Sequence, residues 1–320
     1  MLRALALTGP TASGKTALSL ALSEQLGCEI ISLDSMQIYR GMDIGTAKAT
    51  EEERRRIPHH MIDFLSPRED FSTECYREGA LAAAREITAR GKIPLFVGGT
   101  GLYLDTLMRA ENTEVPGADP EWRARMLESV KNDGDALALW QRLYEIDPES
   151  AEKTHKNNVK RVLRALEIYE MTGRPKSYFD ALSLTRAPET DVGVITLDFH
   201  SREALYSRID LRVDEMMKGG LLAEVERLYS EGQLKPDTTA AQAIGYKEML
   251  SYIKNEATLE EAVDAVKLAS RRYAKRQLTW FRHVESAYHL FVDNEDGTLR
   301  AQSEIVREAH AIFSKMLNQK

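Results

Sequence analysis

Cysteine is scarce in this 320-residue chain, and long apolar runs are absent. The two cysteines, Cys28 and Cys75, lack the spacing of metal ligands, so we expect no disulfide framework and a reducing, cytoplasmic setting. No stretch of eighteen apolar residues occurs, which predicts no membrane span. The first residues also lack the pattern of a secretory signal peptide, and we find no internal repeat or low-complexity tract.

The rest of the composition is typical of a soluble globular protein. Hydrophobic residues make up 43% of the chain and charged residues 29%, and a chain of this length can form one or two domains. The formal net charge of −7 argues against nonspecific binding to nucleic acid, but the distribution of charge matters more than its total.

A phosphate-binding loop stands near the N-terminus, with the pattern G-x-x-x-x-G-K-[ST]. Its glycines let several backbone N–H groups point at one anion, its lysine adds positive charge, and its threonine hydroxyl can hold Mg²⁺. Residues 2–8 form the expected strand before it, and residues 16–26 form the amphipathic helix after it. A glycine turn without a ligand is the alternative, and the loop does not identify its ligand. The predicted anion-binding residues are Gly9, Pro10, Thr11, Ala12, Ser13, Gly14, Lys15 and Thr16.

Strands and helices alternate over the first hundred residues. Residues 29–33 and 93–97 are expected strands, and residues 71–90 are an expected helix between them. This alternation predicts an α/β fold with a parallel sheet covered by helices on both faces. Ligands of such sheets bind beyond the carboxyl ends of the strands, where Thr16, Asp34 and Thr100 fall.

The pattern changes near residue 112. A turn-rich segment, 114–120, precedes a helical stretch from 121 to about 179, with breaks expected at Gly134, Asp147-Pro148 and Gly173-Arg174-Pro175. Strand character returns at 192–199, helices follow over 202–280, and 288–292 is a possible last strand before a C-terminal helix. We therefore predict a core formed by 1–112 and 189–320, with an all-helical insertion at 113–188.

Asp34 ends the second expected strand and faces the phosphate-binding loop across the predicted cleft. Its carboxylate suits a general base or a water-mediated partner of Mg²⁺, while a turn or N-cap aspartate is an equal alternative. The third strand ends in Gly98-Gly99-Thr100-Gly101 where nucleotide-hydrolysing machines usually carry an aspartate. These glycines suggest a close approach of backbone to substrate, with a plain tight turn as the alternative.

Two stretches, 153–164 and 271–283, each carry five Lys or Arg and no acidic residue. Together they favour a local nucleic-acid track, and aromatic residues in the second can stack on bases. A solvated helix face is the alternative for either. His59-His60 beside Asp63 lacks further ligands at metal spacing, so a structural role is favoured, and Trp280-Phe281 is favoured as core.

The chain resembles the bacterial tRNA dimethylallyltransferase family, the tRNA isopentenyltransferases. The resemblance spans nearly the whole chain in the family's order and departs from it at Ala49, where proline is usual. It implies a P-loop NTPase-like fold and no zinc site. It rests on the phosphate-binding loop and on the blocks Asp34-Ser35-Met36-Gln37, 41–48, 58–60, 97–103, 161–167, 242–248 and 274–282.

The resemblance implies the reaction and its partners. Dimethylallyl diphosphate is expected in the loop, with Lys15, Mg²⁺ on Thr16, and Arg208 holding its diphosphate. Asp34 is the expected general base toward N6 of adenosine 37, which is flipped out of the anticodon loop of tRNA. The expected tRNA-binding residues are Asp34, Ser35, Met36, Gln37, Thr100, Arg123, Asn158, Lys160, Arg161, Arg164, Gln242, Gly245 and Tyr246.

Three other functions are compatible with parts of the sequence. A small-molecule or nucleoside kinase shares the loop, the aspartate and the glycines, but requires ATP and leaves both basic stretches unexplained. A non-catalytic RNA-binding protein predicts that Asp34→Ala changes nothing. An isopentenyltransferase acting on free AMP or ATP has no need of the large insertion. We expect a monomer.

Overall fold

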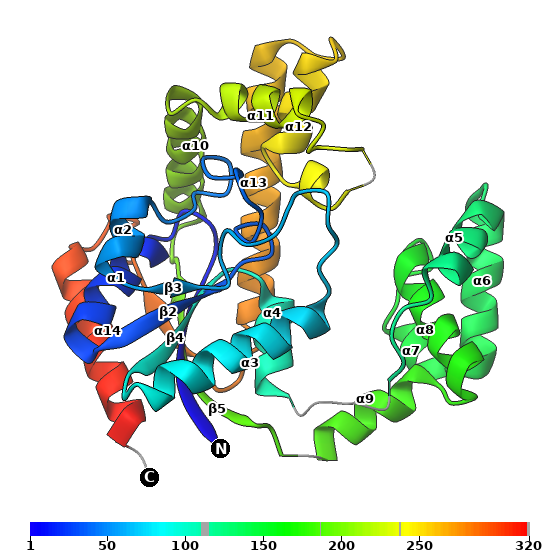
Figure 1. Cartoon of the computed structure of the whole chain (residues 1–320), viewed down its shortest axis with the longest axis horizontal. Coiled ribbons are helices and arrows are strands. Elements are labelled where there is room, and N and C mark those ends of the chain that lie inside the picture. Colours follow the sequence, from blue (N-terminus) through cyan, green and yellow to red (C-terminus); the bar gives the residue numbers. More distant parts are fainter. Residues whose placement is uncertain (110–114, 186, 237, 319–320) are drawn as a thin grey trace. The chain divides into compact units, whose positions relative to one another are not determined.

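Six parallel strands form one sheet, in the order β3-β2-β4-β1-β5-β6 (Figure 1). The computed structural model describes residues 1–109, 115–185, 187–236 and 238–318. The predicted parallel α/β sheet is confirmed, although the sequence analysis did not anticipate the edge strand at residues 59–60. The strands are β1 Leu2–Thr8, β2 Cys28–Leu33, β3 His59–His60, β4 Ile93–Gly98, β5 Thr190–Asp198 and β6 Tyr288–Phe291.

Fifteen helical segments are found in the described part of the chain, including one short 3₁₀ helix. They are α1 Lys15–Leu26, α2 Glu51–Arg56, α3 Thr73–Ala89, α4 Gly101–Met108, α5 Pro120–Ser129, α6 Asp133–Ile146, α7 Pro148–Glu152, α8 Val159–Thr172, α9 Lys176–Thr185, α10 Arg202–Lys218, α11 Leu221–Ser230, η1 Ala240–Gln242, α12 Tyr246–Ile253, α13 Leu259–Phe281 and α14 Gln302–Asn318.

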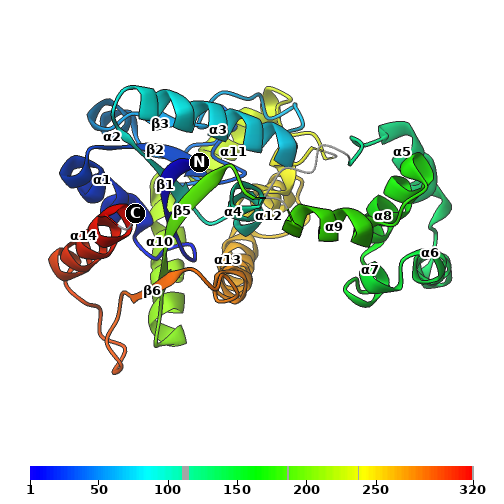
Figure 2. The same ribbon diagram turned by 90° about the horizontal axis from the view of Figure 1, so that it is seen from below.

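The alternation of side chains along β1 explains how the sheet is covered. Leu5 and Leu7 point to one face and pack with α1 and α14, whereas Ala4 and Ala6 point to the other and pack with α3 and α4 (Figure 2). Small residues on the second face let the helices approach closely. Both faces are buried, as a parallel sheet requires.

A third apolar cluster lies beyond the sheet, where α10, α11, α12 and α13 gather (Figure 1). It buries Ile38, Tyr39 and Met42 from the segment after β2 together with apolar residues of the four helices. The segment that follows the second strand is thereby anchored to helices from the other end of the sequence.

The chain divides into two compact units, residues 1–108 with 190–320, and residues 109–189. The second unit contains α5 to α9 around a small core that includes Leu143, Val162 and Leu166. The break expected at Gly134 was misplaced. Asn132 caps the N-terminus of α6, so Gly134 lies inside that helix's first turn. Within the described residues, no helix is long and apolar enough to cross a membrane.

Candidate active site

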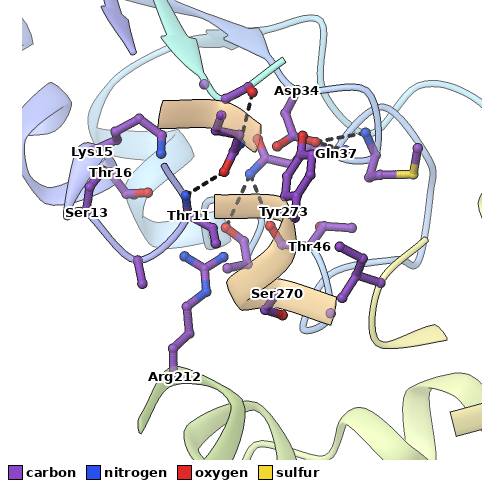
Figure 3. Close-up of a pocket in the computed structure, with 18 of the residues that line it drawn as sticks. Thr11, Ser13, Lys15, Thr16, Asp34, Gln37, Thr46, Arg212, Ser270 and Tyr273 are labelled. Carbon is purple, nitrogen blue, oxygen red and sulfur yellow. Dashed lines mark hydrogen bonds between the residues drawn. The ribbon is translucent and has the colours of Figure 1, made fainter. Parts of the chain in front are cut away.

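A cavity of about 550 Å³ opens at the carboxyl edge of the sheet. Its walls come from the loop between β1 and α1, the end of β2, the segment 45–49, α10, residues 242–245 and α13. Figure 3 shows Lys15 and Thr16 on one side of this space and Asp34 and Tyr273 on the other. The cavity therefore joins an anion-binding loop to a carboxylate.

The phosphate-binding loop is folded for an anion. α1 begins at Lys15, directly after Gly14, whose φ of 91° is in the left-handed region. The Lys15 ammonium donates to the carbonyl oxygens of Gly9 at 3.0 Å and Pro10 at 2.6 Å. Burial and the neighbouring charge of Arg212 lower the pKa of Lys15 to about 7, against an opposing effect of Asp34. Among the described residues, the buried Ser13 hydroxyl finds no hydrogen-bond partner, and it lies on the cavity wall where a ligand oxygen could reach it.

Two arginines one helical turn apart on α10 approach this loop. Arg208 Nε donates to the Ala12 carbonyl oxygen at 2.8 Å. Arg212 lines the cavity, and Figure 3 shows its side chain reaching toward the loop. Burial lowers the pKa of Arg212, while Asp34 and Glu215 oppose that shift. The sequence analysis selected Arg208 and missed Arg212, although the i, i+4 spacing on one helix face was a usable signal.

Asp34 forms the turn that the sequence offered as one alternative, and it also lines the cavity. Its Oδ1 accepts from the backbone N–H groups of Met36 at 2.8 Å and Gln37 at 3.3 Å, so it forms the turn that follows β2. Its carboxylate also lines the cavity, and these turn bonds do not use Oδ2. A turn aspartate with one oxygen engaged keeps a second oxygen for chemistry.

Residues around Asp34 are held by hydrogen bonds from other elements. Ser35 N–H donates to Thr100 Oγ1 at 3.1 Å. The Gln37 amide accepts from Ser32 Oγ at 2.9 Å and donates to the carbonyl oxygens of Thr46 and Ala47 at 3.3 and 3.4 Å. Thr100 is not among the residues that line the cavity, and it contacts the site through the backbone of Ser35 and the side chain of Tyr273.

Gln277 on α13 is a site residue that the sequence analysis did not select. Its buried side chain accepts from Thr11 N–H at 2.9 Å and donates to the Gly99 carbonyl oxygen at 2.9 Å. One amide thus braces the phosphate-binding loop against the end of β4. Its position within the basic stretch 271–283 gave no sequence signal, because a single glutamine has no motif of its own.

The glycines after β4 have protein neighbours that the sequence analysis did not foresee. A methyl group at Gly99 would lie 2.1 Å from Gln277 Nε2, and one at Gly101 would lie 2.3 Å from Cδ1 of Trp280. Gly98 and Gly99 do line the cavity, but α13 is what demands glycine at positions 99 and 101. Phe281 is fully buried, as expected of a core residue. Trp280 is 36% exposed although its ring packs against Gly101, so the core role expected of Trp280 is wrong.

Comparisons with known proteins decide the family. The family model described as IPP transferase matches residues 37–284, and the one described as isopentenyl transferase matches residues 2–63. The chain belongs to the IPP transferase family. A relative from Bacillus cereus (strain B4264), named tRNA dimethylallyltransferase, is 49% identical over 302 residues, 94% of this chain and 92% of that protein. A relative of the same name from Thermoanaerobacter sp. (strain X514) is 43% identical over 302 residues, with 94% and 95% covered.

Solved structures give the same assignment. The full-length tRNA isopentenylpyrophosphate transferase from Bacillus halodurans is 40% identical with a TM-score of 0.73, and 99% of this chain and 97% of that chain are covered. A eukaryotic dimethylallyltransferase acting on tRNA is 30% identical with a TM-score of 0.82, and 100% of this chain and 81% of that chain are covered. The P-loop NTPase-like fold of this IPP transferase is thereby confirmed.

Within the helical unit, the RNA-binding candidates of this IPP transferase fall into two groups. Arg123 and Arg164 both form ion pairs with Glu167, a carboxylate that is only 1% exposed, at 2.6 Å each. Asn158, Lys160 and Arg161 are exposed at the start of α8, where Asn158 is the N-cap. The first group holds the unit together, whereas in the second group Asn158 caps α8 and Lys160 and Arg161 are exposed.

The second basic stretch divides in the same way. Arg271 pairs with Asp210, and Arg282 pairs with the buried Asp198. Arg272, Lys275 and Arg276 are exposed, and Arg276 also lines the cavity.

Residues 242–246 of the IPP transferase contribute unequally to the site. Gln242 and Gly245 line the cavity, whereas Tyr246 is 0% exposed. A direct RNA contact by the Tyr246 side chain, which the resemblance implied, does not fit this burial.

The two histidines of β3 have structural partners. His59 Nδ1 lies 2.7 Å from the Ile57 carbonyl oxygen, and burial lowers the pKa of this histidine. His60 Nε2 lies 2.8 Å from Glu29 Oε2. No group of three or more His, Cys, Asp or Glu that could hold a metal occurs among the described residues. The structural role favoured for this pair is in agreement with these contacts.

Proposed function

We propose that this IPP transferase moves the dimethylallyl group of dimethylallyl diphosphate to N6 of adenosine 37 in tRNA. The observation that carries the proposal is that the phosphate-binding loop and Asp34 face each other in one shared cavity. The C1–O bond of the allylic diphosphate breaks, the bond from C1 to N6 forms, the N6 proton leaves, and diphosphate departs with the electron pair of the broken bond.

The loop stabilises the departing diphosphate. Its backbone N–H groups, the unpartnered Ser13 hydroxyl and the Lys15 ammonium are placed to receive phosphate oxygens. Arg212 adds a second cation inside the cavity. Arg208 does not line the cavity, and its bond to the Ala12 carbonyl oxygen fixes the loop that holds the diphosphate.

Mg²⁺ fits this site as a ligand shared with the substrate. The Thr16 hydroxyl lines the same cavity as Asp34, and Mg²⁺ usually takes one or two protein ligands and completes its shell with phosphate oxygens and water. When bound, Mg²⁺ supplies positive charge that favours departure of the diphosphate. The donor set is sparse, so we propose binding together with the diphosphate.

Asp34 accepts the proton. Adenine N6 is a poor nucleophile because its lone pair is delocalised into the ring, so removal of its proton as the C–N bond forms lowers the barrier. The turn bonds to Oδ1 fix the direction of the carboxylate, and Oδ2 is the oxygen we assign to the proton. The reaction needs a site that is closed to water when both substrates are bound, because water would otherwise capture the allyl cation.

The RNA is proposed to contact two exposed basic surfaces. Lys160 and Arg161 stand at the N-terminus of α8, where positive side chains oppose the helix dipole, so an arriving phosphate removes an unfavourable arrangement. Arg272, Lys275 and Arg276 form the other surface on α13, beside the cavity. The adenine itself is proposed to lie against Ser35, Met36, Gln37, Gln242 and Gly245. The anticodon stem-loop as the docking region, the monomeric state and the cytoplasmic location stay predictions.

The test is direct. The protein is incubated with unmodified tRNA, dimethylallyl diphosphate and Mg²⁺, and the digested nucleosides are weighed by mass spectrometry. Adenosine heavier by one dimethylallyl group supports the proposal, and the masses of ribonuclease fragments of the same tRNA should assign the added group to position 37 only. Unmodified RNA from folded protein contradicts it, and an ATP-consumption screen would then examine the kinase alternative, which the comparisons do not favour.

A further inference from the structure

Four hydrogen-bond donors converge on the carboxylate of Glu224 on α11. Its Oε2 accepts from the backbone N–H groups of Asp43 at 3.0 Å and Ile44 at 2.8 Å. Its Oε1 accepts from Gly45 N–H at 3.1 Å and from the Tyr246 hydroxyl at 2.5 Å. Glu224 is 7% exposed, so four donors replace the water that it has lost.

Tyr246 completes this arrangement from α12. Its ring lies against Gly45, where a methyl group would come within 2.4 Å of Cε2, so no other residue permits this contact. Burial and the adjacent Glu224 raise the pKa of Tyr246. The hydroxyl therefore stays protonated and donates to the carboxylate.

The backbone held in this way is a wall of the cavity. Gly45, Thr46 and Ala47 line it, and the carbonyl oxygens of Thr46 and Ala47 accept from the Gln37 side chain. Gln37 lies three residues after Asp34, in the same turn. Glu224 is thus connected, through the backbone of residues 43–47, to the side of the site where we place the adenine. In the described part of the chain, it has no such connection to the phosphate-binding loop.

We propose that Glu224 and Tyr246 are positioning residues for the nucleoside half of the reaction. They fix the backbone of residues 43–45 so that the 45–47 wall and the Gln37 amide are set for the adenine before it arrives. This inference rests on the proposed function, because it assigns the adenine to that side. Pre-set walls matter for transfer, since a misplacement of about 1 Å can cost on the order of a hundredfold in rate.

The variants are Glu224→Gln and Tyr246→Phe, with Glu226→Gln as the control on an exposed position of the same helix. Glu224→Gln keeps the shape but turns an NH₂ group toward a backbone donor. We expect kcat/KM for tRNA to fall on the order of tenfold to a hundredfold, while the Kd for dimethylallyl diphosphate stays within about twofold. Tyr246→Phe removes one bond and should lose on the order of tenfold or less.

Two readouts separate positioning from a merely structural role. Hydrogen exchange of the peptide spanning 41–48 should accelerate in Glu224→Gln and not in Glu226→Gln. The double variant should lose less than the product of the single losses, because both changes act on one carboxylate. Tyr246→Phe keeps the test decisive if Glu224→Gln does not fold.

Each other outcome overturns the inference. Faster hydrogen exchange with unchanged kcat/KM for tRNA would show that transfer does not require a fixed 45–47 backbone. A parallel loss of diphosphate affinity and tRNA activity, in proportion to unfolded protein, would show a stability role alone. Failure of the wild-type protein to modify tRNA would instead overturn the proposed function, and the exchange data would still report on the contact.

Discussion

Nε of Arg208 lies 2.8 Å from the carbonyl oxygen of Ala12, although 196 positions separate the two residues. A guanidinium that is bound to the loop by one N–H restrains the backbone of that loop. Arg212, one turn further along α10, has its charge inside the cavity instead. The two arginines should therefore be separable by experiment.

Arg212→Ala should raise the Kd for inorganic pyrophosphate by a factor of about ten to a hundred, because it removes a charge-assisted contact worth about 1.5–3 kcal/mol. The free energy of unfolding should change less than this. Arg208→Ala should weaken binding and also loosen the loop, seen as faster hydrogen exchange at residues 9–16. Calorimetric titration measures the affinities. Arg202→Ala, exposed at the start of the same helix, is the control and should bind like wild type.

Asp34→Asn should lower kcat for tRNA modification by about a hundredfold to ten-thousandfold, the range for loss of a general base. The amide keeps an oxygen for the turn bonds to Met36 and Gln37, so the fold should persist. Single-turnover measurement of transfer, with pyrophosphate affinity measured in parallel, checks the result. A single-turnover rate equal to that of wild type would exclude Asp34 as the base.

Binding of pyrophosphate should depend on pH through Lys15. The pKa of Lys15 is about 7 in the free protein, so its side chain is largely a neutral amine above that pH. Binding of the anion then requires the amine to take up a proton from solvent. Affinity should thus fall as pH rises from 7 to 9, by up to about tenfold per pH unit. Lys15→Arg stays charged and should lack this slope. Comparing the wild-type protein with Lys15→Arg cancels the effect of the ionisation of pyrophosphate itself. Equal slopes of affinity against pH in the two proteins would contradict the assignment.

Lys48→Met should reduce the free energy of unfolding by about 2–4 kcal/mol. The Lys48 side chain is 1% exposed, and its ammonium donates to Asp43 at 2.6 Å, Asp63 at 2.7 Å and the Tyr39 carbonyl oxygen at 2.7 Å. Urea denaturation measures the loss. Lys153→Met is the matched control, because its pair with Glu149 is exposed on both sides and should be worth less than about 1 kcal/mol. A loss for Lys48→Met no larger than this would contradict the prediction.

The same cluster predicts a response to acid. Burial alone would raise the pKa of Asp63, but hydrogen bonds from Lys48 and Arg54 lower it overall. A lowered folded pKa contributes stability above the unfolded value of about 3.9, and that contribution is lost as pH falls through the folded pKa. Asp63→Asn should therefore flatten the decline of stability below about pH 4. An unchanged acid limb in urea denaturation would contradict this role.

The sequence predicted those parts of the site that are local in the chain. The loop at 9–16 and Asp34 could be found because each motif carries its own turn geometry. Gln277 and Glu224 were not found, because each acts on backbone more than 150 positions away and has no local pattern. Arg212 was missed although its spacing from Arg208 on one helix face was a usable signal. The edge strand β3 was missed for a related reason, since two residues are too short to show periodicity.

The structure shows which basic residues are paired within the protein and which are exposed, and the sequence alone could not distinguish them. Arg164 and Arg161 are equivalent in the printed sequence, yet one pairs with Glu167 and the other is exposed on α8. The difference lies in which face of the helix each occupies relative to a buried carboxylate.

The bond between Thr11 and Gln277 also bears on synthesis of the chain. The two residues are 266 positions apart, so the phosphate-binding loop leaves the ribosome long before the side chain that braces it exists. A chain cut before α13 retains the whole loop motif but lacks this brace. Truncated chains should therefore carry the signature of the family and fail to hold pyrophosphate as the full chain does, so the competent loop is the product of nearly completed translation.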